Sequence, residues 1–357
     1  MEKNLKILHV IDDKKFIPYC NATFDSDTIE NTFCRSEDFE VIANTNYFHI
    51  IAIHYLNTTS AHVLNKNDFD APVIWFFWGG DGFLLGKFSN SFLLPKTKTL
   101  LLKQAFSEGL GLGIKTFFKS LIPTLADKLQ NNSEVICSLD KINIVVPVMP
   151  GDYHLMNQKY GLKAPMFHLN YVNPIFDESQ ITLNIGDNIL LGNSASYSNN
   201  HLESIDLLSE MDLGNRHVII PLSYGDKKYG EYINSYAKKK LEDKVICLME
   251  FVPLEDYFKL LESCPIVIMN HLRQQAVGNI VPMLAKGSHV YLQLKSSLYQ
   301  FLKENGFVVS SIDEVKSIRE LTNEEKIKNA KLCVTFFGKK TQHRKVETLL
   351  KTVLTDR

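Results

Sequence analysis

The second half of the chain alternates short apolar runs with amphipathic segments, and this alternation restricts the possible folds more than any other feature. The apolar runs cover residues 188–195, 217–225, 244–252, 264–271 and 288–294. Segments with helical periodicity follow them, for example the stretch that begins at residue 199. Because the runs are apolar enough to be buried on both faces, the pattern predicts an α/β fold with a doubly wound parallel sheet.

The first half of the chain shows a less regular version of the same pattern. Expected strands cover 5–11, 47–56, 71–81, 135–140 and 142–149, with helices near 97–108 and 114–130. The segment 151–185 has no clear period. We therefore expect a second α/β sheet.

A chain of 357 residues is long enough for two domains of about 150 residues each. We expect two Rossmann-like doubly wound domains facing a central cleft, an acceptor-binding one over 1–180 and a nucleotide-sugar-binding one over 181–340. The basic helix at 341–357 is expected to pack back across the domain junction. In such sheets ligands bind beyond the carboxyl ends of the strands, so the residues that follow each strand are the candidates for a site.

Composition restricts the setting of the protein. The formal net charge of −1 gives no general attraction to nucleic acid. Six cysteines without a CxxC pair favour the reducing cytoplasm. No stretch reaches the roughly 18–20 apolar residues that cross a bilayer, and the charged N-terminus is expected to be a first strand, so we expect a cytoplasmic protein that at most rests on a membrane.

Small polar residues follow two of the strands in the second half. The loop GNSASYSNNH begins with Gly192, Asn193 and Ser194 and leads into a helix whose free amides could hold an anion. An ordinary polar turn with a helix cap explains the same residues. In the loop PLSYG, Tyr224 could stack on a base or a sugar, although packing is the commoner role of such a tyrosine.

The strand CPIVIMNH leads into the strongest candidate for a donor site. The polar residues after it are His271, Arg273, Gln274 and Gln275, followed at a helix start by Gly278 and Asn279. Amides near the helix start could hold a diphosphate, the arginine could pair with phosphate oxygens, and the histidine could also donate to phosphate. A solvated polar turn is the alternative.

The element WGGDG follows the apolar strand VIWFF in the first half. Its carboxylate, Asp81, could accept a proton from an attacking sugar hydroxyl, or could simply stabilise its own turn. Trp78, Gly79 and Gly80 would then lie on the acceptor side, because glycines permit close approach of a ligand. His9, near the end of the first strand, and His54 could orient the acceptor, although histidines at strand ends are more often structural.

The second half also resembles a known family. The stretches ILLGNSASYSNNHLESIDLL, VIIPLSYG and FVPLEDYFKLLESCPIVIMNHLRQQAVGNIVPMLAKG are similar, in order and spacing, to the TDP-N-acetylfucosamine:lipid II N-acetylfucosaminyltransferases. The resemblance covers roughly 185–305, and in the first half mostly WGGD. It implies a GT-B glycosyltransferase that moves 4-acetamido-4,6-dideoxygalactose from a dTDP-sugar to a polyprenyl-diphosphate-linked glycan during synthesis of enterobacterial common antigen.

The resemblance also implies a donor pocket. Its lining would be Gly192, Asn193, Ser194, Tyr224, Arg273, Gln274, Gln275 and Gly278. In the general GT-B pattern, backbone groups of Phe251 and Val252 would read the base and Leu254 would pack on it. Many GT-B enzymes carry a ribose-binding glutamate where this chain has NIVPMLAKG, so ribose recognition is left unassigned.

Metal and membrane binding have weaker signals. The sequence has no HExxH, no DxD and no Cys/His cluster, so we expect neither a metal ion nor a cofactor. Lysines and phenylalanines crowd the window 83–120, which suits an anionic membrane surface but also the outer face of ordinary helices. Other open possibilities are a different GT-B transferase, with another nucleotide sugar or a non-lipid acceptor, and a non-catalytic nucleotide-sugar-binding protein. A nucleotide-sugar dehydrogenase is excluded because LKILHVIDDKKF lacks the glycines of a GxGxxG motif.

Overall fold

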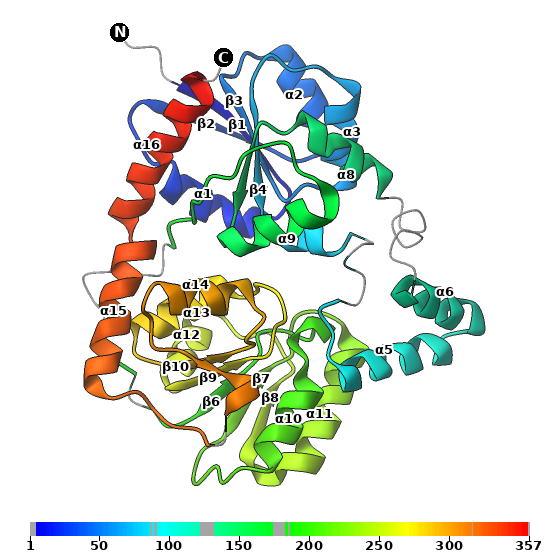
Figure 1. The fold of residues 1–357 in the computed structure, drawn as a ribbon, viewed down its shortest axis with the longest axis vertical. Helices are drawn as coiled ribbons and strands as arrows, with labels where there is room; N and C mark the ends of the chain where they lie inside the picture. Colours follow the sequence, from blue (N-terminus) through cyan, green and yellow to red (C-terminus); the bar gives the residue numbers. More distant parts are fainter. Residues whose placement is uncertain are drawn as a thin grey trace. The chain divides into compact units, whose positions relative to one another are not determined.

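The computed structural model describes residues 5–85, 88, 91–121, 132–173, 183–184, 186–315 and 317–355. The chain divides into two compact units, each made from separate stretches (Figure 1). The first unit contains residues 1–89, 118–176 and 336–357, and the second contains 90–117 and 177–335. Residues 90–117, which the sequence placed in the first domain, thus group with the second unit.

The first unit is built on a five-stranded parallel sheet. Its strands are β1 (Leu5–Ile11), β2 (Ile29–Cys34), β3 (Ile50–His54), β4 (Val73–Phe77) and β5 (Ile144–Pro147). They lie in the order β2-β1-β3-β4-β5, and every neighbouring pair is parallel. The order reverses between β1 and β3, which is where doubly wound sheets open a crevice for ligands.

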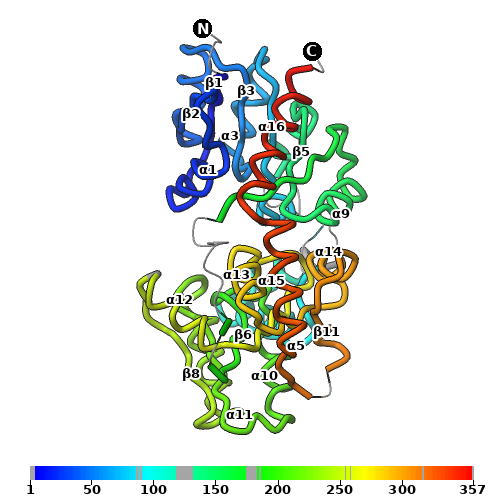
Figure 2. The backbone as a smooth tube through the Cα atoms, turned by 90° about the vertical axis from the view of Figure 1, so that its left-hand side faces the viewer, coloured from blue at the N-terminus to red at the C-terminus, as the bar shows by residue number. Residues whose placement is uncertain are grey.

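Helices cover both faces of this sheet. They are α1 (Ile17–Thr23), α2 (Phe39–Thr45), α3 (Thr58–Lys66), α4 (Gly80–Phe83), α8 (Ser133–Ser138), α9 (Pro150–Tyr160) and α16 (Lys339–Thr355). Figure 1 shows α2, α3 and α8 on one side of the strands and α1 and α16 on the other. Apolar residues of α16 pack into the core together with strand residues such as Ile50 and Phe76, and the path of α16 can be followed in Figure 2.

The sequence misassigned two elements of the first unit. The strand expected at 135–140 is the helix α8, because a single short apolar run does not distinguish a strand from a buried helix turn. Strand β2 was not expected, because it lies at the edge of the sheet and its sequence, IENTFC, is half polar.

The second unit contains a six-stranded parallel sheet. Its strands are β6 (Ile189–Leu191), β7 (Val218–Pro221), β8 (Val245–Leu248), β9 (Ile266–Met269), β10 (His289–Leu292) and β11 (Ser310–Ser311). They lie in the order β11-β10-β9-β6-β7-β8. The order reverses between β6 and β9, so the loops after these two strands flank the expected ligand crevice of this unit.

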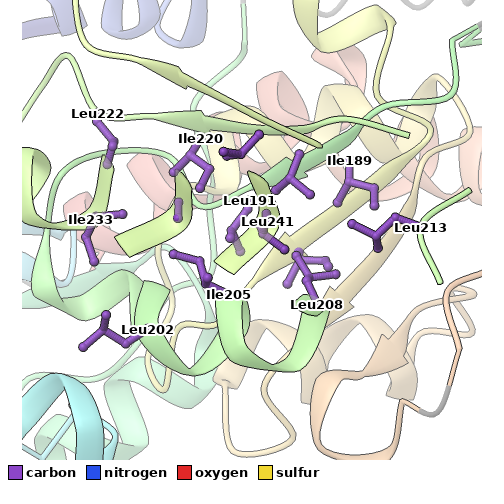
Figure 3. Packing of buried hydrophobic residues seen from close by; sticks show 14 of the residues in the cluster. Ile189, Leu191, Leu202, Ile205, Leu208, Leu213, Ile220, Leu222, Ile233 and Leu241 are labelled. Atoms are coloured by element: carbon purple, nitrogen blue, oxygen red, sulfur yellow. The ribbon is translucent and has the colours of Figure 1, made fainter. Parts of the chain in front are cut away.

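The helices of the second unit follow the expected alternation closely. They are α5 (Pro95–Ser107), the start of α6 (Leu110–Leu121), α10 (His201–Ser209), α11 (Lys227–Leu241), α12 (Leu254–Glu262), α13 (Val277–Ala285), α14 (Ser297–Glu304) and most of α15 (Asn323–Phe337). Figure 3 shows the core beneath α10 and α11, where Leu191 and Ile220 of the strands meet Ile205 and Ile233 of the helices. Because this packing holds the strands in place, it also sets where their carboxyl ends and the loops after them lie.

Two parallel α/β sheets therefore confirm the predicted fold class. Among the described residues, no helix is long and apolar enough to cross a bilayer. The cleft between the domains stays a prediction.

Candidate functional site

The loops after β6 and β9 meet at one buried side chain, Asn199. Its Oδ1 accepts hydrogen bonds from the backbone N–H of Asn193 at 3.0 Å and from Nε2 of His271 at 2.8 Å. Its Nδ2 donates to the carbonyl oxygen of Ser194 at 3.0 Å. One amide thus joins both sides of the β6–β9 switch point.

A second set of hydrogen bonds ties the same two loops together. Nε2 of Gln275 donates to Oδ1 of Asn193 at 3.1 Å, and Oγ of Ser198 donates to Oε1 of Gln275 at 2.7 Å. Of the predicted donor-site residues, the structure therefore brings Asn193, Ser194, His271 and Gln275 into one network. The network belongs to the folded sheet edge and not to one local turn, because its bonds join residues 82 and 77 positions apart in the sequence.

Gly192 is required for packing. Its φ of +69° is a conformation that L-residues rarely adopt. A Cβ at this position would lie 2.6 Å from Nε2 of His201 and 2.7 Å from Oδ1 of Asn199. The space beside Gly192 is thus filled by the protein's own side chains.

His271 is buried and neutral. Burial holds its pKa well below the usual range, and the nearby charge of Arg273 lowers the pKa further. Because Nε2 donates to Asn199, Nδ1 carries a lone pair, and among the described residues neither Nδ1 nor Oε1 of Gln274 has a hydrogen-bond partner. The predicted donation to phosphate would require a protonated His271, which burial opposes.

The start of α13 has the features of an anion site. Ala276, the residue before the helix, has a φ of +60° and turns the chain sharply into it. Gly278 is exposed, and a Cβ on it would meet nothing within 4 Å, so there is open space above the first turn. Arg273 lies just before this turn, and Asn279 Nδ2 donates to the hydroxyl of Tyr257 at 3.4 Å. Amides and a nearby guanidinium are the groups that bind phosphate oxygens.

The remaining donor-site candidates lie on the surface. The side chains of Tyr224 and Phe251 are 71% and 84% exposed, and Val252 is partly buried. The side chain of Leu254 lies outside the described residues. The carbonyl of Tyr224 accepts from the backbone N–H of Ala195 at 2.7 Å, which joins the β7 loop to the loop that carries Asn199. Contact of these candidates with a nucleotide stays a prediction.

In the first unit, Asp81 is buried at the start of α4. Its Oδ2 accepts from Nε1 of Trp75 at 2.7 Å and from the backbone N–H of Leu56 at 3.0 Å, while Oδ1 accepts from the N–H of Trp78 at 3.1 Å. Burial raises the pKa of Asp81 to about 7, against the effect of these hydrogen bonds. The carboxylate therefore ties together the ends of β3 and β4.

The acceptor-side candidates form an aromatic group around this turn. Trp78 is partly exposed, and its ring centroid lies 4.2 Å from that of Phe16 and 6.0 Å from that of Tyr55. Gly79 has a φ of +96°, and Gly80 lies beneath the ring of Tyr55. The turn WGGD thus presents an aromatic surface beside the β1–β3 switch point.

His9 and His54 lie beneath that surface. Both are buried, and Nδ1 of His9 lies 2.9 Å from Nε2 of His54. His9 also contacts Asn31, and His54 contacts the hydroxyl of Tyr171. Both side chains are buried, and the contact with an acceptor that we expected of His9 stays a prediction.

Sequence reasoning missed the residues that organise both sites. Asn199 was visible only as a potential helix cap, and Tyr171 lies in the segment without clear periodicity. Phe16 follows a predicted strand and Tyr55 lies at the end of another, which was a usable signal. Within the described ranges, no group of three or more His, Cys, Asp or Glu residues could hold a metal ion.

Comparison with known proteins identifies the family. Residues 168–352, just over half of the chain, match the sequence model of the family described as 4-alpha-L-fucosyltransferase, glycosyl transferase group 56. The chain belongs to this family. The protein is therefore a glycosyltransferase, and the matched region contains the whole Asn199 network and the start of α13.

Solved structures support the fold. A sucrose-phosphate synthase from Thermosynechococcus elongatus superposes with a TM-score of 0.66 at 6% identity, covering 99% of this chain and 100% of that one. The Anabaena protein HepE in complex with UDP-glucose gives 0.63 at 10% identity, with 98% and 100% coverage. A glycosyltransferase from Rickettsia africae gives 0.61 at 12% identity and full coverage of both chains. At these identities the similarity shows the GT-B fold alone.

Proposed function

We propose that this glycosyltransferase moves 4-acetamido-4,6-dideoxygalactose from a dTDP-linked donor to a polyprenyl-diphosphate-linked glycan in the synthesis of a bacterial surface polysaccharide such as enterobacterial common antigen. The observation that supports this most is the Asn199 network, because it builds a polar edge at the β6–β9 switch point within the family-matched region. The proposed sugar is a 6-deoxygalactose like fucose, the sugar in the family description, but carries an acetamido group at C4.

The reaction needs stabilisation of a departing diphosphate. A hydroxyl oxygen of the acceptor forms a bond to the anomeric carbon while the bond from that carbon to the diphosphate oxygen breaks. In the proposed mechanism, Arg273 and the amides at the start of α13 bind the diphosphate as its charge grows. These groups replace a metal ion, so we propose transfer without a metal or another cofactor.

The acceptor hydroxyl loses a proton when it attacks, and Asp81 is the candidate base that would take it up. A pKa of about 7 suits a general base at neutral pH. Its three donors, however, already occupy both carboxylate oxygens, which favours a role in holding the WGGD turn. The base role stays a prediction that a variant can decide.

A lipid-linked acceptor calls for contact with a bilayer, and we propose that α5 and α6 provide it. The exposed large apolar side chains there are Phe106, Leu110, Leu112, Ile114 and Phe117. Lys103 and Lys115 are exposed among them, which suits an anionic lipid surface. Two other members of the predicted window, Phe83 and Phe88, are buried in the core and do not contribute.

Sedimentation with anionic vesicles tests the membrane proposal. Ile114→Glu should abolish co-sedimentation at low salt, because it places a charge in the apolar surface. Val41→Glu is a matched control, since Val41 is equally apolar and 65% exposed on α2. Equal binding by both variants would contradict the proposal.

A thermal-shift comparison of dTDP, UDP and GDP tests the donor class. At a hundredfold excess over Kd, binding to the folded state stabilises by about 2.7 kcal/mol. The proposal predicts the largest shift with dTDP. The second candidate is a transferase that uses a UDP-sugar, which the likeness to the UDP-glucose complex of HepE favours, and preference for UDP would support it instead.

A further inference from the structure

Three aromatic side chains gather at the carboxyl edge of the first unit's sheet. Phe16 follows β1, Tyr55 follows β3 and Trp78 follows β4, and all three are partly exposed. The ring centroid of Trp78 lies 4.2 Å from that of Phe16 and 6.0 Å from that of Tyr55. The β1–β3 switch point, where doubly wound sheets bind ligands, lies between the first two.

The backbone is strained where it carries the Tyr55 ring. Tyr55 has a φ of +73°, a conformation that is uncommon and strained for a bulky residue. A Cβ on Gly80 would lie 3.1 Å from Cε2 of the Tyr55 ring, so the glycine leaves room for the ring. Strain of this kind persists where the surrounding structure fixes it, and it concentrates at binding sites.

Trp78 is anchored from below by a buried hydrogen-bond chain. Its Nε1 donates to the hydroxyl oxygen of Tyr171 at 2.9 Å, and this hydroxyl contacts Nδ1 of His54. Nε2 of His54 meets Nδ1 of His9 at 2.9 Å, and Nε2 of His9 meets Oδ1 of Asn31 at 2.9 Å. The chain thus runs from the surface ring to the edge strand β2.

The direction of every bond in this chain is fixed from its two ends. Asn31 donates its Nδ2 to a backbone carbonyl, so its Oδ1 must accept from His9. A neutral His9 then accepts at Nδ1 from His54, and His54 accepts at Nδ1 from the hydroxyl of Tyr171. Trp78 can only donate, so the chain is complete with both histidines neutral. Burial lowers the pKa of both, in agreement with this assignment.

We propose that Phe16, Tyr55 and Trp78 form a stacking surface for a sugar ring of the acceptor, and that Tyr171 is the positioning residue that orients Trp78. The apolar C–H face of a pyranose packs on the faces of aromatic rings. A neutral ligand suits the place, because the nearby charges are held by the protein: Asp81 is buried with donors on both carboxylate oxygens, and Lys15, whose Nζ lies 5.1 Å from the Phe16 ring centroid, pairs with Asp13 at 2.8 Å. The proposal rests on the proposed function, since it takes the acceptor to be a glycan.

Saturation-transfer NMR on the full chain tests the surface without any turnover. The probes are free N-acetylglucosamine, its β1,4-linked dimer and galactose at about 10 mM, a concentration that detects affinities of about 1 mM. The wild type should transfer saturation to ring C–H protons of at least one probe. Trp78→Ala should lose at least about tenfold in affinity, and Phe16→Ala is the second variant should Trp78→Ala fail to fold.

Tyr171→Phe tests the positioning role. It removes the hydroxyl that accepts from Trp78, and affinity for the probe should fall about fivefold. The matched control is Tyr153→Phe, because the Tyr153 hydroxyl in the same unit donates to the carbonyl of Ala164 at 2.9 Å and takes no part in the chain. Equal losses of probe affinity in the two variants would show that Tyr171 has a merely structural role, and this would overturn the proposal.

Two further results would overturn the proposal. One is the absence of saturation transfer from the wild type to every probe, and the other is unchanged transfer in a folded Trp78→Ala. The dTDP thermal shift is measured on the same samples. Failure of the sugar surface with an intact dTDP shift contradicts this inference alone, whereas loss of the dTDP preference contradicts the proposed function.

Discussion

Asp81 shows how one side chain can fit two roles at the residue scale. Its raised pKa suits a base, while its three donors suit a structural clamp. Replacing the carboxylate by an amide of the same shape, as in Asp81→Asn, separates the two roles. A clamp depends on two accepting oxygens, whereas a base depends on an ionised carboxylate that can take up a proton.

Asp81→Asn should lower the free energy of unfolding by about 1–3 kcal/mol, because one amide N–H2 would face donors that now bind an oxygen. Urea unfolding at pH 7 measures this, with the exposed Asp70→Asn as control. Unchanged stability with lost transfer would instead establish the base role.

Arg273→Lys should weaken dTDP binding about tenfold while leaving the thermal midpoint unchanged. Lysine keeps the charge but cannot bind two phosphate oxygens side by side. Isothermal titration with dTDP measures the affinity, and the exposed Arg35→Lys serves as control. Full affinity in Arg273→Lys would remove this side chain from the donor site.

At the element scale, the β6 and β7 loops depend on a close backbone contact. Ala195 and Gly225 form a bridge in which the N–H of Asp226 donates to the carbonyl of Ala195 at 2.8 Å. Gly225 has a φ of +119°, and a Cβ on it would collide with the carbonyl of Ala195. The loop that carries the donor network therefore tolerates no side chain there.

Gly225→Ala should cost about 1–3 kcal/mol of stability, from strain at positive φ and from the backbone collision. Gly278→Ala is the matched control, because a Cβ there meets nothing within 4 Å. Thermal unfolding of both variants gives the comparison, and equal midpoints would show that the loop can rearrange.

Five of the six strands of the second sheet were predictable because they lie in apolar runs between helices, whereas β11 consists of two serines and was not expected. The expected runs at 217–225 and 264–271 contain β7 and β9, and a helix follows each of these strands as the alternation predicts. Polar elements were not predictable, as β2 shows. The Asn199 network could not be predicted either, because hydrogen bonds between residues 77 and 82 positions apart depend on the finished fold.

At the scale of the whole molecule, buried neutral histidines make stability depend on pH. Burial lowers the pKa of His9 and His168 to about 4 and that of His201 to about 3. In the unfolded chain these histidines take up protons below about pH 6.5, so the stability they contribute is lost as pH falls from there toward their folded pKa values. Asp81 acts oppositely over about pH 4–7, because its folded pKa is raised.

These three histidines, together with His54 and His271, whose pKa values burial also lowers, outweigh the one aspartate, so stability should fall as the pH is lowered from 6.5 to 4.5. Each histidine contributes about 1.4 kcal/mol per pH unit in this window, and Asp81 offsets about one of them. Urea unfolding across the range measures the slope. A flat or rising stability toward pH 4.5 would show that these histidines are charged in the folded protein.

The central claim is that the edge formed by the loops after β6 and β9 and by the start of α13 binds a nucleotide diphosphate. Hydrogen exchange read by mass spectrometry, with and without saturating dTDP, tests it most directly. We predict slower exchange in peptides covering 192–201 and 270–279, with little change in peptides that cover β2 or α16. Unchanged exchange in both donor loops at saturation, or protection confined to the first unit, would contradict the account.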